Sequence, residues 1–143
     1  MGSASVKPLQ SQAENKNTYD WSNVSLRGSS EEIRKFLISN YDEINWSELS
    51  QNRYGIAMIF LEENYEHIDW TNLSKNSSYG ALRILCRNQH KIVWNELMMN
   101  KSSGVEKLLR ENPDKIVSDI LYLNKSKWAI NLFIELCTNK NKI

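Results

Sequence analysis

Hydrophobic residues recur along this chain with a period of about 24 residues. The clearest markers are four tryptophans spaced by 25, 24 and 24 residues: Trp21, Trp46, Trp70 and Trp94. An aliphatic residue follows each of them three positions later, namely Val24, Leu49, Leu73 and Leu97. One further step of 24 residues leads to Ser118, which Leu121 follows in the same way. The pattern therefore predicts five repeats, the last without its tryptophan.

A second hydrophobic pattern completes each repeat. One row contains Ile33, Ala57, Ala81, Val105 and Ala129, and another, four positions later, contains Leu37, Leu61, Leu85, Leu109 and Phe133. Together with a third row between them, these rows give the spacing i, i+3, i+4 of one face of an α-helix. Columns of asparagine flank this stripe at Asn52, Asn76, Asn100 and Asn124, and at Asn40, Asn64, Asn88 and Asn112. Asparagine favours caps and turns over helix interiors.

Each repeat is thus predicted to be a helical hairpin, a short helix with Ile-x-Trp-x-x-Leu followed by a longer helix with the stripe. The second Asn column, with Pro113 directly after Asn112, predicts an N-cap and a first helical residue. The short helices are therefore expected over 65–73, 89–97 and 113–121. The alternative is that Ile-x-Trp forms a short strand, because its apolar residues alternate.

One hairpin cannot bury its stripe alone, whereas stacked hairpins share a continuous core. The predicted fold is all-α, a helical-hairpin solenoid of about five repeats forming a single domain over residues 19–143. The polar lead over residues 1–18 is expected to be disordered or a cloning remnant. The predicted core contains Trp21, Trp46, Trp70, Trp94, Leu49, Leu73, Leu97, Leu61, Leu85 and Leu109.

The motifs over 44–52 (INWSELSQN) and 108–116 (LLRENPDKI) resemble repeats of proteins encoded by large DNA viruses of protists and algae. Those repeats read approximately Ile-Asn-Trp-x-x-Leu-Ser-x-Asn-Pro, then Leu-Leu-Glu-x-Asn-Pro-x-Lys. The resemblance covers about residues 21–136. This chain departs from it because proline survives only at Pro113 and each repeat is about two residues longer. The resemblance implies a viral or protist origin and a helical repeat, but no active site.

Charge and cysteine content narrow the class of protein. The 143 residues include 18 basic and 17 acidic ones, for a net charge of +1, so the chain differs from strongly basic nucleic-acid-binding domains. Two cysteines provide no disulfide framework. No signal-peptide pattern opens the sequence. We therefore expect a soluble protein that is not secreted and is located in the cytoplasm (the host cytoplasm if viral) or in a virion.

The residues that could carry chemistry are few. His67 and His90 stand in neighbouring repeats without a converging set of metal ligands, and we expect them to be solvated loop residues. Cys86 lies between Arg83 and Arg87, which could activate a thiolate, but a small, partly buried residue is the simpler interpretation. The sequence therefore predicts neither an enzyme nor a cofactor or metal site.

Outward-facing rows of the long helices provide the candidate interaction surface. One row is mildly basic and includes Lys35, Ile59, Arg83 and Lys107. Together with the nearby Arg87 and Arg110, these residues form the candidate interaction surface. A neighbouring row alternates in charge through Glu63, Arg87 and Glu111, which predicts salt bridges between repeats. The preferred function is a protein-interaction or scaffolding module that binds a host or virion protein along the solenoid. The alternatives are a nucleic-acid-binding repeat protein and a structural virion component that self-assembles end to end.

Overall fold

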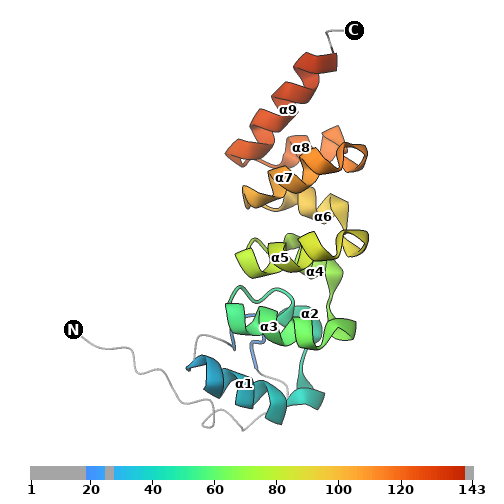
Figure 1. Ribbon diagram of the computed structural model, residues 1–143. Coiled ribbons are helices and arrows are strands. Elements are labelled where there is room, and N and C mark those ends of the chain that lie inside the picture. Colours follow the sequence, from blue (N-terminus) through green and yellow to red (C-terminus); the bar gives the residue numbers. More distant parts are fainter. Residues whose placement is uncertain (1–18, 25–27, 141–143) are drawn as a thin grey trace, which may run out of the picture. The chain divides into compact units, whose positions relative to one another are not determined.

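In the computed structural model, which describes residues 19–24 and 28–140, every regular element is helical (Figure 1). The prediction of an all-α fold is confirmed. The alternative of a short strand at Ile-x-Trp finds no support in these residues, where Ile44, Ile68 and Ile92 each begin a two-residue non-helical link between helical turns. No helix within the described ranges has the length and apolar character needed to cross a membrane.

Contacts divide the chain, predicted as one domain, into two compact units, Met1–Asp69 and Trp70–Ile143. The predicted disordered lead, 1–18, lies outside the described residues. The first unit contains α1 (Ser30–Ser39), η3 (Tyr41–Glu43), α2 (Trp46–Leu49), α3 (Gly55–Glu63) and η4 (Tyr65–His67). The second contains α4 (Trp70–Lys75), α5 (Tyr79–Arg87), η5 (Gln89–Lys91), α6 (Trp94–Met99), α7 (Gly104–Glu111), η6 (Pro113–Lys115), α8 (Ser118–Leu123) and α9 (Lys127–Lys140).

Two of the long helices, α1 and α5, begin at a side-chain cap. Ser29 and Glu32 form a capping box at α1, in which each side chain bonds the other residue's backbone N–H. Ser78 Oγ accepts the N–H of Ala81 at 3.2 Å and so caps α5. These side chains satisfy N–H groups that have no partner within the helix.

The segment predicted as one short helix is in fact two elements. Residues 113–115 form the 3-10 turn η6, Ile116 and Val117 are extended, and α8 begins at Ser118. The predictions over 65–73 and 89–97 are wrong in the same way. The physical reason lies in the extended isoleucine: Ile68 and Ile92 are buried to 6% and 7% exposure. β-Branched residues also lose side-chain freedom in a helix, which favours the break.

The asparagine column after the long helices occupies the predicted N-cap position of the next element, with Pro113 as the first residue of η6 after Asn112, but the asparagine side chains bond the preceding helix. Asn64 Nδ2 donates to the carbonyl of Phe60 at 2.8 Å, and Asn88 Nδ2 to that of Ile84 at 2.8 Å. Asn112 Nδ2 likewise donates to the carbonyl of Leu108 at 2.9 Å, and its side chain makes no cap bond to the turn that follows. Carbonyls in the last turn of a helix lack intrahelical partners, so these donors supply them.

The predicted leucine core is fully buried. Each of these leucines has 0% exposure: Leu49, Leu61, Leu73, Leu85, Leu97 and Leu109. In the second unit α4, α6 and α8 pack each on the next, and so do α5, α7 and α9 (Figure 1). The packing is tight at the start of α7, where a Cβ on Gly104 would lie 2.8 Å from Leu82 Cδ1.

Candidate interaction surface

The four tryptophans of the repeat were predicted to lie in the core, but three of them are only half-buried. Trp21 is buried, with 4% exposure, but Trp46, Trp70 and Trp94 are only half-buried. Each of these three residues begins a short helix, so its indole lies at the rim of the repeat while the leucine three positions later occupies the centre. Trp128, which is outside the repeat frame, is buried at 6% exposure. The column is therefore partly accessible, and only its first member is a core residue.

The sequence predicted that His67 is a freely solvated loop residue, and this prediction is wrong. It is half-buried, and its ring stacks on Trp46 with centroids 4.3 Å apart and planes 12° apart. Trp46 in turn stacks on Phe60 at 6.0 Å and 5°. Stacked and edge-on aromatic pairs add stability beyond area burial, so this cluster stabilises the first unit. His90 is exposed.

The loops that lead from a short helix into a long helix, which we call the entry loops, comprise residues 50–54, 76–78, 100–103 and 124–126. A buried asparagine fixes each of them: Asn52, Asn76, Asn100 and Asn124. Asn124 Nδ2 donates to the carbonyls of Met98 at 2.7 Å and Asn100 at 3.0 Å. Asn100 Nδ2 donates in the same way to those of Ser74 at 2.9 Å and Asn76 at 3.0 Å.

The amide oxygen of the same asparagines fixes the loop itself. Asn100 Oδ1 accepts the N–H of Ser102 at 2.9 Å, and Asn124 Oδ1 accepts that of Ser126 at 3.0 Å. Asn52 does the same in the first unit, with Tyr54 N–H at 2.9 Å. Since buried polar groups are stable only when hydrogen-bonded, the bonds of Asn100 and Asn124 hold the last two entry loops in register, each with the loop before it.

Buried serines make a second link between successive repeats. Ser74 Oγ donates to the carbonyl of Trp70 at 2.7 Å and accepts the N–H of Val93 at 3.1 Å. Ser50 accepts the N–H of Asp69 at 3.0 Å in the first unit. In the next repeat Met98 replaces serine, and its sulfur lies 3.3 Å from the N–H of Val117. Thioether sulfur is a weak acceptor, so this link is the weakest.

The entry loops bring together basic side chains that the sequence analysis did not select. The residue after each buried asparagine is Arg53, Ser77, Lys101 or Lys125. In the second unit Lys75 and Lys127 flank these loops, and all four lysines there are exposed. From Leu73 to Asn95 and from Ile120 to Ile134 the sequence contains no acidic residue. The signal was available as a fixed position seven residues after the tryptophan, but only the fold shows that the positions in the second unit share one edge.

Helix polarity adds to this positive charge. In the second unit α5, α7 and α9 all begin at entry loops, so the partial positive charge of their N-termini lies at the same edge. Neither α5 nor α9 has an acidic residue in its first turn, whereas α7 has Glu106. Among the described residues, no ion pair is formed by Lys101 or Lys127, while Lys75 lies 3.5 Å from Glu96. This edge therefore attracts anionic groups.

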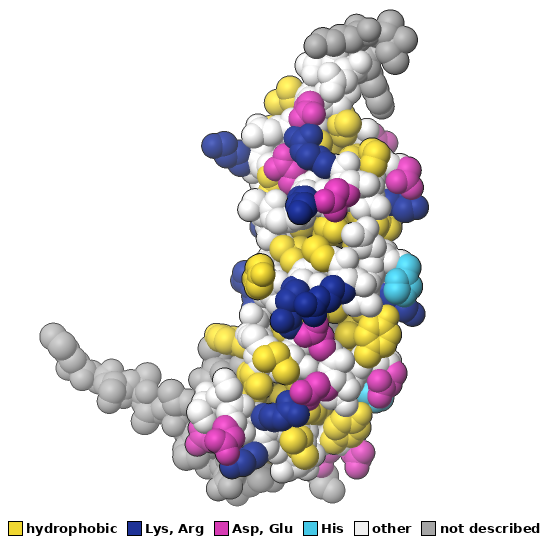
Figure 2. Space-filling view, viewed as in Figure 1, with side chains coloured by type: hydrophobic (Ala, Val, Ile, Leu, Met, Phe, Trp, Pro, Cys, Tyr) yellow, Lys and Arg dark blue, Asp and Glu magenta, His cyan; other side chains and the backbone are white. Residues whose placement is uncertain are grey.

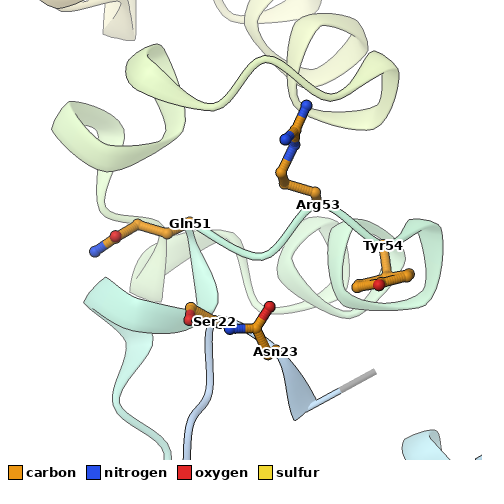
Figure 3. A pocket seen from close by; sticks show the side chains of 5 residues that line it. All are labelled: Ser22, Asn23, Gln51, Arg53 and Tyr54. Carbon is orange, nitrogen blue, oxygen red and sulfur yellow. Dashed lines mark hydrogen bonds between the residues drawn. The ribbon is translucent and has the colours of Figure 1, made fainter. Parts of the chain in front are cut away.

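Shallow pockets border the entry loops in both units. In the first unit a pocket of about 560 Å³ is lined by Ser22, Asn23, Gln51, Arg53 and Tyr54. Figure 3 shows Ser22 and Asn23 beside each other, with Arg53 pointing away from them. Ser22 and Asn23 donate to Asp20 and so lower its pKa. Among the described residues, the lining includes the Ser22 and Tyr54 hydroxyls but no histidine, cysteine or carboxylate, so the pocket offers polar contacts.

In the second unit a pocket of about 430 Å³ is lined by Lys101, Ser103, Glu106, Ser126, Lys127, Trp128 and Asn131. It lies between two consecutive entry loops. Exposed tyrosines stand next to the loops as well, Tyr54 at 40% and Tyr79 at 84% exposure. Lysine, tyrosine and small polar residues thus form the accessible surface of this edge.

The predicted basic row of the long helices carries less free charge than its sequence indicates. Lys35 lies 2.7 Å from Glu31, and Lys107 lies 3.8 Å from Glu111. Ile59 is exposed, Arg83 is half-buried and Arg87 is exposed. Figure 2 shows basic, acidic and hydrophobic side chains intermixed within each unit on the face it presents. This row is therefore an ordinary surface of mixed charge and not a stripe of positive charge.

Arg110, the last of the predicted surface residues, joins two helices. It bonds Glu106 on its own helix α7 at 2.9 Å and Glu135 on α9 at 2.7 Å. Hydrogen bonds from Arg110 lower the pKa of Glu135, and those carboxylates raise the pKa of Arg110. Glu63 pairs similarly with Arg34, at 2.7 Å. Ion pairs were predicted between residues at the same position of successive repeats. Arg110–Glu135 and Arg34–Glu63 instead join residues at different positions of the repeat.

No group of three metal-binding side chains occurs in the described part of the chain. Cys86 and Cys137 are both exposed as free thiols. Comparison with protein-family models, with curated proteins and with solved structures found no match. The residues themselves therefore provide the only basis for assigning a function.

Proposed function

We propose that this protein is a helical-hairpin solenoid that acts as an interaction module, and that it binds an acidic segment of a partner protein along its entry loops. The solenoid arrangement is supported by the recurrence of the same hydrogen bonds every 24 residues within the second unit, from Asn100 to Ser74 and Asn76, and from Asn124 to Met98 and Asn100. Repeat proteins of this type present extended binding surfaces.

The observation that carries the proposal is the segregation of charge at the entry loops. Lys101 and Lys127 border one pocket, and two stretches around these loops lack acidic residues. Helix N-termini add partial positive charge at the same edge. An acidic peptide segment would gain from both, because charge complementarity steers association and fixes register.

A protein partner is favoured over nucleic acid by the remaining character of this edge. Exposed Tyr79, Met99 and Leu123 stand beside the lysines, at 84%, 41% and 58% exposure. Tyrosine and methionine are enriched at protein interfaces. The net charge of +1 also gives no overall field of the kind found in strongly basic nucleic-acid-binding domains.

Charge reversal tests the proposal. The variant Lys101→Glu/Lys125→Glu/Lys127→Glu alters the entry loops, and Lys35→Glu/Lys107→Glu is the control, because those lysines are equally exposed but lie on the long helices. The probes are a fluorescein-labelled peptide of alternating Glu and Ser and a single-stranded DNA of equal charge, measured by fluorescence anisotropy. We expect the peptide to lose at least about tenfold in affinity with the loop variant only.

Two outcomes contradict the proposal. Equal losses with both variants would show that net charge, and not the entry loops, attracts the peptide. Tighter binding of the DNA than of the peptide, with a steep dependence on salt concentration, would identify phosphate contacts and a nucleic-acid binder.

A further inference from the structure

The last repeat of the second unit leaves uncovered a set of positions that earlier repeats bury. Ile92 is 7% exposed, whereas its counterpart Ile116 is half-buried. Ser74 and Met98 are fully buried, whereas Tyr122 in the same column is 58% exposed. Part of the interface by which one repeat contacts the next is therefore exposed at Ile116 and on α8.

The same comparison holds for α9. Leu85 and Leu109 are fully buried, whereas Phe133 is half-buried. Ile130 and Ile134 on α9 stand one repeat after the half-buried Glu106 and the exposed Arg110 of α7, and they are 43% and 54% exposed. Arg110 contacts Glu135 of the following repeat. The position of Arg110 in the repeat therefore faces the following repeat. We call Tyr122, Ile130, Phe133 and Ile134 the terminal face.

One carbonyl of this stacking interface is already bonded within the chain itself. In the preceding repeats the carbonyls of Ser74 and Met98 accept the side chain of an asparagine one repeat later. The equivalent carbonyl, that of Tyr122, accepts Lys125 Nζ at 3.0 Å, and this ammonium lies 4.3 Å from the centre of the Tyr122 ring. The apolar residues of the terminal face remain exposed or half-buried.

We propose that the terminal face binds the terminal face of a second copy of this chain, in a two-fold symmetric dimer. The apolar columns continue the interface that joins α5 to α7 and α7 to α9. A head-to-tail contact with the first repeat would need the asparagine donor of the ladder, and the first repeat has Arg27 six residues after Trp21, followed by Gly28. A symmetric apolar contact needs no such donor, and two-fold dimers use the same patch on both subunits.

Charge on α9 suits an antiparallel pair of these helices. Lys127 stands at its first residue and Glu135 in its second half. In an antiparallel pair centred between Ile130 and Ile134, the Lys127 end of each helix lies beside the Glu135 half of the other. A parallel pair would place like charges together instead. The apolar residues of the terminal face are distinct from the entry-loop lysines, but Lys127 takes part in both proposals, so the dimer is tested below by changes to the terminal face alone.

Sedimentation velocity of the full chain over a range of concentrations tests this dimer. We expect the apparent mass to double as concentration rises. Ile130→Lys/Ile134→Lys should abolish the doubling, and Ile59→Lys should keep it, because Ile59 is similarly exposed, at 45%, on a long helix of the first unit. All these side chains are exposed, and a far-UV spectrum equal to that of the parent confirms that the variants fold.

Energy transfer between dyes on Cys137 shows which ends meet. In a Cys86→Ser background Cys137 is the single labelling site, since the chain has two cysteines. The proposed dimer brings both α9 helices together and gives transfer between copies. A monomer at every concentration, a dimer that persists in Ile130→Lys/Ile134→Lys, an assembly without transfer, or unlimited growth would each overturn the proposal.

Discussion

Asparagine marks both turns of each repeat, yet the two turns use it for different purposes. In the entry loops Asn100 is 2% exposed and bonds backbone groups of both its own loop and the preceding one. In the turns that follow the long helices, which we call the exit turns, Asn88 is half-buried and bonds the carbonyl four residues before it. The first asparagine joins neighbouring repeats, and the second completes one helix.

This difference shows where the stability of the array resides. Removing the Asn88 side chain breaks one local hydrogen bond, which water can replace. At the other exit turns Asn112 Nδ2 also donates to Gln89 Oε1, and Asn64 Oδ1 accepts from Tyr41. An entry-loop asparagine cannot be lost without leaving buried backbone groups unpaired in two repeats, because its side chain supplies donors to one and an acceptor to the other. The entry loops are therefore the more rigid edge, which suits a binding surface.

Replacing the two asparagines tests this contrast and should give the largest effect. Asn100→Ala removes three hydrogen bonds, of 2.9, 3.0 and 2.9 Å, in a buried site. We expect it to lower the free energy of unfolding by about 3–5 kcal/mol, since each unpaired buried group costs about 1–3 kcal/mol. Asn88→Ala should cost about 0.5–1.5 kcal/mol. Urea denaturation measures both, and equal losses would contradict the contrast.

The serine link should give the next largest effect. Ser74→Ala removes the acceptor that bonds the N–H of Val93 at 3.1 Å, in a fully buried position. We expect a loss of about 1–3 kcal/mol in the free energy of unfolding. The control is Ser103→Ala, because Ser103 is exposed and its side chain makes no cap bond. If both variants unfold at the same urea concentration, the link between successive repeats contributes nothing.

The sequence was sufficient for features that depend on local periodicity. The helical class and the buried columns of Leu85 and Leu109 follow from the spacing of apolar residues. The role of Asn112 could not be predicted in the same way, because asparagine suits both the start and the end of a helix, and the choice depends on which carbonyl lies within reach. The break in the helix at Ile116 could not be predicted for a related reason, because the neighbouring repeat decides how far that side chain is buried.

The candidate site was harder to predict than the fold. Lys35 and Lys107 were selected because they are basic in one column, but their carboxylate neighbours, Glu31 and Glu111, stand four residues away on the same helix. Lys101 and Lys127 were missed, because their positions in the sequence do not show that they lie close together in the fold. Their common edge becomes visible only after the entry loops are placed beside each other.

Two glycines at the starts of long helices sharpen the contrast between tight and open entry loops. A Cβ added at Gly55 meets nothing within 4 Å, whereas one added at Gly104 lies 2.8 Å from Leu82 Cδ1. Gly55→Ala should therefore raise the free energy of unfolding by about 0.4–1 kcal/mol, because the unfolded chain loses freedom. Gly104→Ala should give a smaller gain or a loss, since Leu82 must shift. Thermal denaturation compares the two, and a larger gain for Gly104→Ala would show that α5 and α7 are less closely packed than described.

The smallest expected effect concerns the exposed clamp between α7 and α9, and it is recognised by its dependence on pH. Arg110 lowers the pKa of Glu135 in the folded state by donating hydrogen bonds to it. A carboxylate with a lowered folded pKa adds stability above its unfolded pKa, roughly 4.3, and loses it as the pH falls through the folded value. The Glu135→Gln variant should therefore melt below the parent at neutral pH, and the two should converge as the solution becomes more acidic than about pH 4.

The matched control for this clamp is Glu111→Gln, which removes the same charge from a carboxylate 3.8 Å from Lys107 on its own helix. Its effect at neutral pH should be smaller, because no bond between helices is lost. Added salt should reduce both differences, since exposed charges are screened. If the difference between Glu135→Gln and the parent stays constant from neutral to acidic pH, the stabilisation comes from packing of the Glu135 side chain and not from its charge. The clamp would then be a neutral contact like those of the exit turns.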